Sequence, residues 1–139
     1  MSTRAHILIT DRNEREDKNG ILFYRHSDGY PEGVKESLTN FLSYVEKNII
    51  RDNAQQSAGW LILIGHEEYH QFGSKYPPDE NNKSFGWKVG AYEPVVRIHI
   101  DIDWFYIVDV GHKTITAFEY NGETAVAEFF DRKDGVVIN

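Results

Sequence analysis

Two histidines in the segment GHEEYHQFG, which begins at Gly65, are spaced like the ligands of a zinc hydrolase. His66 and His70 lie four positions apart and Glu67 follows the first of them, which satisfies the pattern H-E-x-x-H. On a helix, imidazoles one turn apart could bind one zinc ion while the glutamate activates a bound water. However, Gly65 and Gly73 flank the motif, and no extension with a third histidine follows it. A structural role is the simpler interpretation, because histidines near a helix C-terminus also interact favourably with its dipole.

A second group of polar residues alternates with isoleucines in RIHIDID, residues 97–103. On a β-strand, this alternation would place Arg97, His99, Asp101 and Asp103 on one face, about 7 Å apart in successive pairs. Such a row could bind a ligand or a metal, and His99 or Asp101 could add a third metal ligand to the HEEYH histidines. The same alternation is typical of the solvent face of an antiparallel sheet, which is the simpler interpretation.

A third candidate lies in the stretch RHSDGY, which joins an apolar run to an expected helix. Arg25 and His26 could bind an anion together with free backbone N–H groups at the helix N-terminus. The stretch is not a phosphate-binding P-loop, because it has too few glycines and no GK[ST] follows. In the structural alternative, Asp28 satisfies turn or cap donors, while Tyr30 and Pro31 hold the helix against the sheet.

The elements that would position these candidates begin with strand-like runs at residues 4–10 and 20–26, which predict a β-hairpin. A helix follows, because apolar residues from 34 to 49 recur at steps of three and four. The next apolar stretch favours a second, largely buried helix over about 53–70. Residues 60–65 taken alone could instead form a buried strand, and the geometry of the zinc motif depends on that choice.

The second half of the chain has β patterns. WKVGAY at 87–92 predicts a short edge strand, VVRIHIDIDW at 95–104 a longer strand, and 105–120 a hairpin. TAVAEFF at 124–130 predicts a final strand. We therefore expect one α+β domain, residues 1–139. Its antiparallel sheet would combine the N-terminal hairpin with a C-terminal β-meander and carry two helices packed on one face.

Aromatic and aliphatic side chains fall on both faces of the strand expected at FYIVDV. Phe105 and Ile107 would point to the face opposite Trp104, Tyr106 and Val108. Either both faces are covered within the chain, or one of them contacts another subunit or a partner. We expect a homo-oligomer or a bound partner on these grounds.

The composition narrows the possible functions. The chain has 139 residues, a net charge of −7 and no cysteine, and its basic residues are scattered. A nucleic-acid partner is therefore not expected, and thiol catalysis, disulfides and cysteine-bound zinc are excluded. The N-terminal residues lack a signal-peptide pattern, and the longest apolar run, WLILI, is too short to cross a membrane. We expect a cytoplasmic protein that does not bind membranes.

Two patches resemble small proteins of unassigned activity that are carried by bacteriophages, prophages and bacterial mobile elements. LFYRHSDGYPEGV, residues 22–34, is similar to their [FY]-x-R-x-x-D-G-Y-P motif between a hairpin and a helix. IHIDIDWFY, residues 98–106, is similar to a later I-H-x-D-x-[DE]-[YWF]-x-Y segment. The resemblance assigns no residue a role. It implies a setting in phage physiology or phage–host conflict, where small acidic proteins often mask a host protein or sequester a small ligand.

We therefore expect a non-enzymatic binding protein of phage or prophage type, without a cofactor, that binds a host protein or a small anionic ligand in the host cytoplasm. A structural component of a phage particle would instead form a large homo-oligomer. The main alternative is a small zinc-dependent hydrolase, with Glu67 as the catalytic residue and His66, His70 and His99 as zinc ligands. In the leading interpretation, the ligand-binding residues are Arg25, His26, Asp28, Tyr30, Arg97, His99, Asp101 and Asp103.

Overall fold

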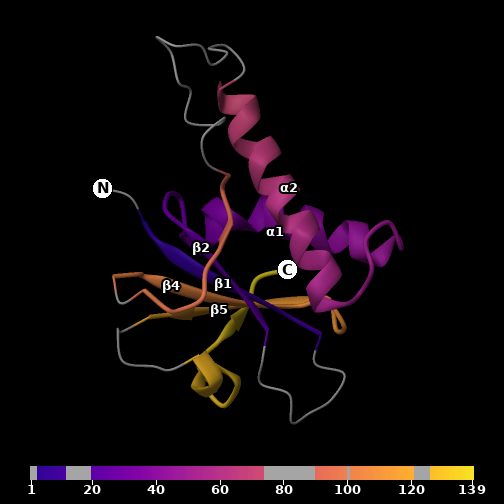
Figure 1. Ribbon diagram of the computed structural model, residues 1–139. Helices are drawn as coiled ribbons and strands as arrows, with labels where there is room; N and C mark the ends of the chain where they lie inside the picture. The colour runs from indigo at the N-terminus through magenta and orange to yellow at the C-terminus, as the bar shows by residue number, and fades with distance from the viewer. Residues whose placement is uncertain (1–2, 12–19, 74–89, 100, 121–125) are drawn as a thin grey trace.

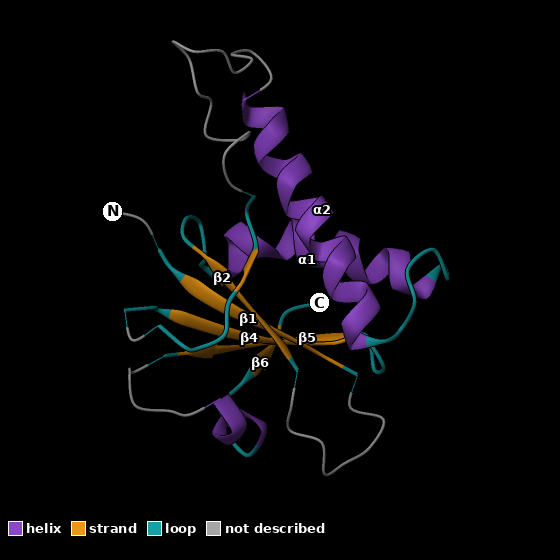
Figure 2. Cartoon of the chain, viewed as in Figure 1, coloured by secondary structure: helices purple, strands orange, loops and turns teal. Residues whose placement is uncertain are grey.

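The computed structural model describes residues 3–11, 20–73, 90–99, 101–120 and 126–139 of the chain, with the backbone alone for 69–73 and 126–127 (Figure 1). Six strands form one sheet in the order β3-β2-β1-β4-β5-β6. Two helices, α1 (Pro31–Glu46) and α2 (Ala54–Gly73), lie together on one side of this sheet (Figure 2). The strands are β1 (Ala5–Thr10), β2 (Ile21–Arg25), β3 (Glu93–Pro94), β4 (Trp104–Asp109), β5 (Thr114–Glu119) and β6 (Val136–Val137).

This architecture confirms the predicted α+β fold with two helices on one face of a sheet that contains an N-terminal hairpin. Both helices follow from sequence periodicity, and the apolar positions of α1 from Val34 to Val45 are buried. Residues 60–65 are helical, so the strand alternative for them is wrong. Length decides in favour of the helix, because α2 continues for 20 residues.

The sheet is mixed, although an entirely antiparallel sheet was expected. The pairs β1–β2 and β4–β5 are antiparallel, whereas β1 and β4 at the centre are parallel. Parallel neighbours need a long crossover connection. The chain from β2 through both helices to β4 provides that crossover, and it covers the sheet on the way. Both central strands are almost fully buried, as strands covered on two faces must be.

Two predicted strands are replaced by other structure. Residues 95–99 and 101–103 are irregular, and regular pairing begins only at Trp104. No edge of β1 is free for such a strand, because β2 and β4 pair with its two sides. The described end of the run expected at 124–130 is a short 3-10 helix, η1 (Val126–Phe130). Of the edge strand expected at 87–92, residues 87–89 lie outside the described chain, and β3 forms just after it.

Both faces of the sheet are covered by the chain itself. On the helix side, Tyr106 and Val108 join the main core, and Trp104 packs against it. On the opposite face, Phe105 and Ile107 belong to a second cluster, which is completed by Ile98 and Ile102 of the irregular segment and by η1. The ring of Phe129 in η1 stacks on Phe105 at 3.9 Å between centroids. The two-faced apolar pattern is thus satisfied within one chain, and the homo-oligomer stays a prediction that needs other support.

None of the helices in the described part of the chain has the length and apolar character needed to cross a membrane.

Candidate functional site

The first polar centre is formed where β2 ends beneath α2. Arg25 is the last residue of β2 and is 2% exposed. Its Nη2 lies 2.8 Å from Oε2 of Glu68, and its Nη1 donates to Oε1 of the same carboxylate at 3.3 Å. Its Nε donates to the backbone oxygen of Ser27 at 2.7 Å. The guanidinium therefore forms a bidentate ion pair, through Nη1 and Nη2, with a residue of the HEEYH segment. This geometry is the strongest for an arginine–carboxylate pair.

Tyr92 also belongs to this polar centre, because it contacts both Arg25 and Ser37. The guanidinium carbon of Arg25 lies 5.0 Å from the centroid of the Tyr92 ring, and the Tyr92 hydroxyl forms a hydrogen bond with the hydroxyl of Ser37 on α1. Complete burial raises the pKa of Tyr92 to about 12, so the phenol stays neutral. We call these four residues, Arg25, Ser37, Glu68 and Tyr92, the Arg25 cluster. They join both helices to the sheet.

Glu68 belongs to the HEEYH segment, but the zinc pattern assigns it no role. Its position could have been inferred from helical spacing, because it lies three residues after Gly65, on the side of α2 that faces the sheet. A side chain at Gly65 would bring its Cβ within 2.8 Å of the Tyr92 ring. Within the segment GHEEYHQFG, Gly65 thus allows a close contact with Tyr92 and Glu68 pairs with the buried Arg25, and both are structural contributions.

The histidines proposed as zinc ligands lie on two sides of the sheet. The backbone from His66 to His70 is helical, but the side chain of His70 is outside the described part of the structure. His66 is half-buried and Glu67 is exposed, both on the helix side. His99 packs on the opposite face, against side chains of β1 and β2, so it does not approach His66. Within the described residues, no group of three or more histidines and carboxylates could hold a metal ion.

The second polar centre brings together two of the stretches selected from the sequence. The ring of His99 stacks on Tyr24 of β2, with 4.4 Å between centroids and 18° between planes. The Tyr24 hydroxyl lies 3.0 Å from Nδ1 of His26, which belongs to the loop after β2. Residues from the RHSDGY loop and from the 97–103 segment therefore meet around a tyrosine. We define the Tyr24 cluster as Arg4, His6, Tyr24, His26, His99 and Asp101.

The buried side chain of His6 in β1 connects β2 to the segment that contains His99. Its Nδ1 lies 2.9 Å from the backbone oxygen of Phe23, and its Nε2 lies 2.7 Å from the backbone nitrogen of His99. A carbonyl can only accept and an N–H can only donate, so Nδ1 carries the proton and Nε2 accepts. The imidazole is fully buried, and this burial lowers the pKa of His6 to about 4. His6 is therefore a neutral group that anchors the irregular segment to the sheet.

Arg4 supplies the positive charge of the Tyr24 cluster. Its Nη1 donates to Oδ2 of Asp101 at 3.0 Å, in a pair whose side chains are 37% and 57% exposed. Its Nε is buried and finds no acceptor among the described residues. A buried donor without an acceptor is costly, and such an atom often marks a place where a water or a ligand is bound.

The other predicted ligand residues lie around these two centres. Arg97 and Asp103 are exposed, and Asp103 pairs through its backbone with Arg4 and Tyr120. Asp28 has a positive φ of 56° in the loop before α1, and the N-cap of that helix is Tyr30, which forms no side-chain cap bond. The structure therefore gathers His26, His99 and Asp101 in one cluster and places Arg25 in the other.

Comparison with known proteins does not place this chain in a family. No protein-family model matches the chain, and no curated protein or solved structure matches it either.

Proposed function

We propose that this chain is a non-enzymatic binding protein that recognises an anionic group at the Tyr24 cluster. The observation that carries the proposal is the buried Nε of Arg4, which has no acceptor among the described residues at a surface where His26 and His99 also converge. The phage or prophage setting that the sequence resemblance implies supplies two sources for the anion. One is a small host ligand that the protein sequesters, and the other is an acidic host protein that it masks.

The chemistry of the cluster suits an anion that replaces Asp101. An exposed ion pair contributes about 0–1 kcal/mol, so Arg4 can exchange one carboxylate for another acceptor at little cost. The planar guanidinium offers several N–H donors to a carboxylate or phosphate. His26 is exposed beside Tyr24, and its imidazole can donate a hydrogen bond to an anion. His99 is held in place by its stacking on Tyr24 and by its bond to His6.

The proposal is tested by following the histidine ring protons by NMR while pyrophosphate is added. Saturable shifts of His26 and His99 are expected, and they should be lost in the variant Arg4→Gln. His112 is a control within the same chain, because it is 64% exposed and pairs with Asp109 on the β4–β5 turn. Equal shifts of all three histidines, or no shifts, would contradict recognition at this cluster.

The same titration with a short acidic peptide separates the two sources of the anion. Tighter binding of pyrophosphate would favour a small ligand, whereas tighter binding of the peptide would favour a host protein. Both outcomes keep the cluster as the binding site, and the Arg4→Gln variant is the reference in each series.

A zinc-dependent hydrolase is the second candidate, and the helical backbone across His66 and His70 favours it. These residues lie one turn apart on α2, as the H-E-x-x-H pattern requires. Elemental mass spectrometry of the untagged protein would find one zinc ion per chain, lost when both histidines are replaced by alanine. Equal metal content in the two proteins would rule this candidate out.

A further inference from the structure

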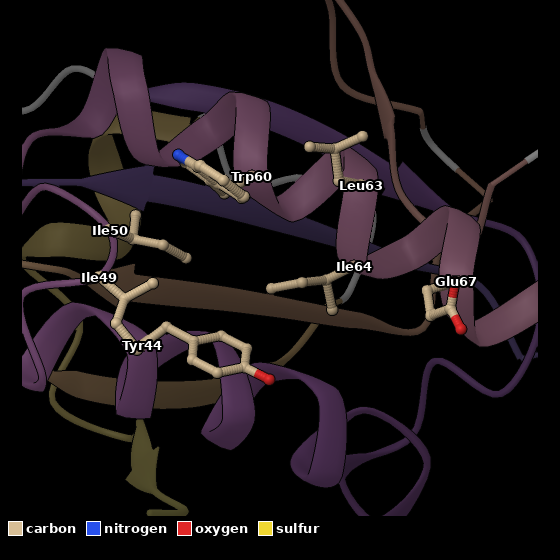
Figure 3. Close-up of a pocket in the computed structure, with 7 residues that line it drawn as sticks. All are labelled: Tyr44, Ile49, Ile50, Trp60, Leu63, Ile64 and Glu67. Atoms are coloured by element: carbon tan, nitrogen blue, oxygen red, sulfur yellow. The ribbon is translucent and has the colours of Figure 1, made fainter.

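The outward surface of the two helices contains an apolar groove of about 270 Å³ (Figure 3). Trp60 and Leu63 of α2 are 45% and 58% exposed, and Ile49, shortly after α1, is 58% exposed. Large exposed apolar side chains that gather in one place mark contact surfaces. We call this surface the α1–α2 groove, and its apolar lining consists of Tyr44, Ile49, Ile50, Trp60, Leu63 and Ile64.

Two glycines of α2 give a second, independent indication. Glycine inside a helix costs about 1 kcal/mol relative to alanine, so each one needs a reason. Gly65 has one within the chain, because its missing side chain makes room for Tyr92 and Ala91. Gly59 has none, since no atom lies within 4 Å of the position its Cβ would occupy. Gly59 lies on the outward side of α2 beside Trp60, where a bare backbone allows another helix to approach closely.

From these observations we infer that two copies of this chain associate through the α1–α2 groove, with α2 packed antiparallel against α2 of the second copy around Gly59. The groove lies on the helix side, whereas the Tyr24 cluster lies on the other face of the sheet. The inference therefore goes beyond the proposed function and does not depend on it.

The exposed apolar side chains of the groove can form the centre of a dimer interface. Trp60, Leu63, Ile49 and Tyr44 are each between 41% and 58% exposed, which leaves on the order of 400 Å² of apolar surface per copy. A stable interface buries about 800 Å² per partner and has an apolar centre with a polar rim. Glutamines and other polar side chains beside the exposed apolar residues of α2 can supply that rim.

A second copy fits the groove because a ridge and a hollow lie side by side on the same surface. In Figure 3, Trp60 and Leu63 project from α2, while Tyr44 and Ile49 lie across the opening. In a twofold interface the same patch meets itself, so the ridge of each copy can enter the hollow of the other. No separate partner is needed to complete the surface.

The antiparallel arrangement follows from charge. Each chain carries a net charge of −7, and Glu67 lies at one end of the groove. Two antiparallel helices that cross near Trp60 would hold the two Glu67 side chains about 20 Å apart along the axis. That separation exceeds the Debye length of about 8 Å at physiological salt, so their repulsion is screened. A parallel pair would bring them side by side.

The inference is tested by sedimentation velocity from low micromolar to several hundred micromolar protein. The unchanged chain should form dimers, and the variants Gly59→Gln and Leu63→Glu should weaken the dimer roughly tenfold or more. Both positions are exposed, so the fold of the monomer should persist, as circular dichroism can verify. Val96→Glu is the matched control, because Val96 is 96% exposed on the irregular segment and should leave the dimer unchanged.

A monomer over the whole concentration range would overturn the inference, as would a loss of dimer in the Val96→Glu control. The orientation has its own test, since the chain has no cysteine. Gly59→Cys should form a disulfide between copies on mild oxidation, because the two backbones would lie within about 7 Å of each other there. Val96→Cys should stay uncrosslinked, and a dimer in which only Val96→Cys crosslinks would contradict the proposed geometry.

Discussion

The Arg25 cluster and the Tyr24 cluster both pair one arginine with one carboxylate, and each ties a segment without regular structure to the sheet. They lie on opposite faces of that sheet, and their burial differs. The Arg25 side chain is 2% exposed and its partner Glu68 is 30% exposed, whereas Arg4 and Asp101 are 37% and 57% exposed. The same chemical pair therefore occupies two very different environments.

This difference separates a structural role from a binding role. Breaking a buried ion pair costs several kcal/mol, so the Arg25 pair cannot open without destabilising the fold. An exposed pair exchanges its partner for water or another anion at little cost. The proposed binding therefore falls to the Tyr24 cluster, whereas the contacts of the Arg25 cluster join the helices to the sheet. The predictions below test this contrast, from the largest expected effect to the smallest.

The largest effect is expected for Glu68→Ala. This change removes the carboxylate that pairs with the buried Arg25 guanidinium, and breaking a buried pair typically costs 3–5 kcal/mol. Because Glu68 is partly exposed, we expect about 2–3 kcal/mol, measured as the free energy of unfolding in urea, with a fall in Tm of roughly 6–12 °C. Glu68→Gln should recover part of the loss, since its amide oxygen can still accept one bond. A loss below about 1 kcal/mol would show that Arg25 does not depend on this partner.

Lowering the pH should reduce the free energy of unfolding through His6, a member of the Tyr24 cluster. The pKa of His6 is about 4 in the folded chain and 6.5 without the protein environment, so the unfolded chain binds this proton more readily. The contribution of His6 to stability is therefore intact above pH 6.5 and is lost as the pH falls towards 4. The total loss is up to about 3 kcal/mol, by the free-energy equivalent of the pKa difference.

Urea unfolding at several pH values measures this loss, with His6→Gln as the comparison. The variant lacks the titrating group, so its free energy of unfolding should change less between pH 6.5 and 4. Equal pH dependence in the two proteins would mean that the pKa of His6 is not lowered in the folded chain.

A smaller effect is expected for Tyr92→Phe in the Arg25 cluster. The change removes the hydroxyl that bonds to Ser37 but keeps the ring beneath the guanidinium. The net value of one such hydrogen bond is about 1 kcal/mol. Ser37→Ala should cost a similar amount, and the double variant should cost less than the sum of the two. Additive losses would show that the two hydroxyls act independently.

Sequence periodicity was sufficient for the parts of the fold that depend on local pattern. Both helices and the two antiparallel hairpins follow from steps of three and four or from short alternating runs. It failed for residues 97–103, where alternation suggested a strand. In this irregular segment, Ile98 and Ile102, four residues apart, both pack in the second core. Alternation of polar and apolar residues cannot by itself distinguish such a segment from a strand. The parallel β1–β4 pair was also missed, because it joins segments nearly a hundred residues apart.

In the two polar clusters, too, local spacing identifies single residues but not the contacts between distant segments. Helical spacing from Gly65 could have identified Glu68, but nothing local connects it with Arg25, 43 positions earlier. His6 lies inside an apolar run, and no local pattern singles it out. Its importance comes from the backbone of His99, 93 positions later, a contact that only the folded chain reveals.

The smallest effect on stability is expected for Asp101→Ala, the counterpart of Glu68→Ala in the Tyr24 cluster. Removing one partner of an exposed pair should change the free energy of unfolding by about 0.5 kcal/mol or less. Its effect on binding should be larger, because Arg4 no longer has to release a carboxylate before it accepts an anion. The NMR titration should then show tighter pyrophosphate binding than in the unchanged chain. A weaker complex would mean that Asp101 itself contributes to the site, and the two arginine–carboxylate pairs would then differ less than their burial suggests.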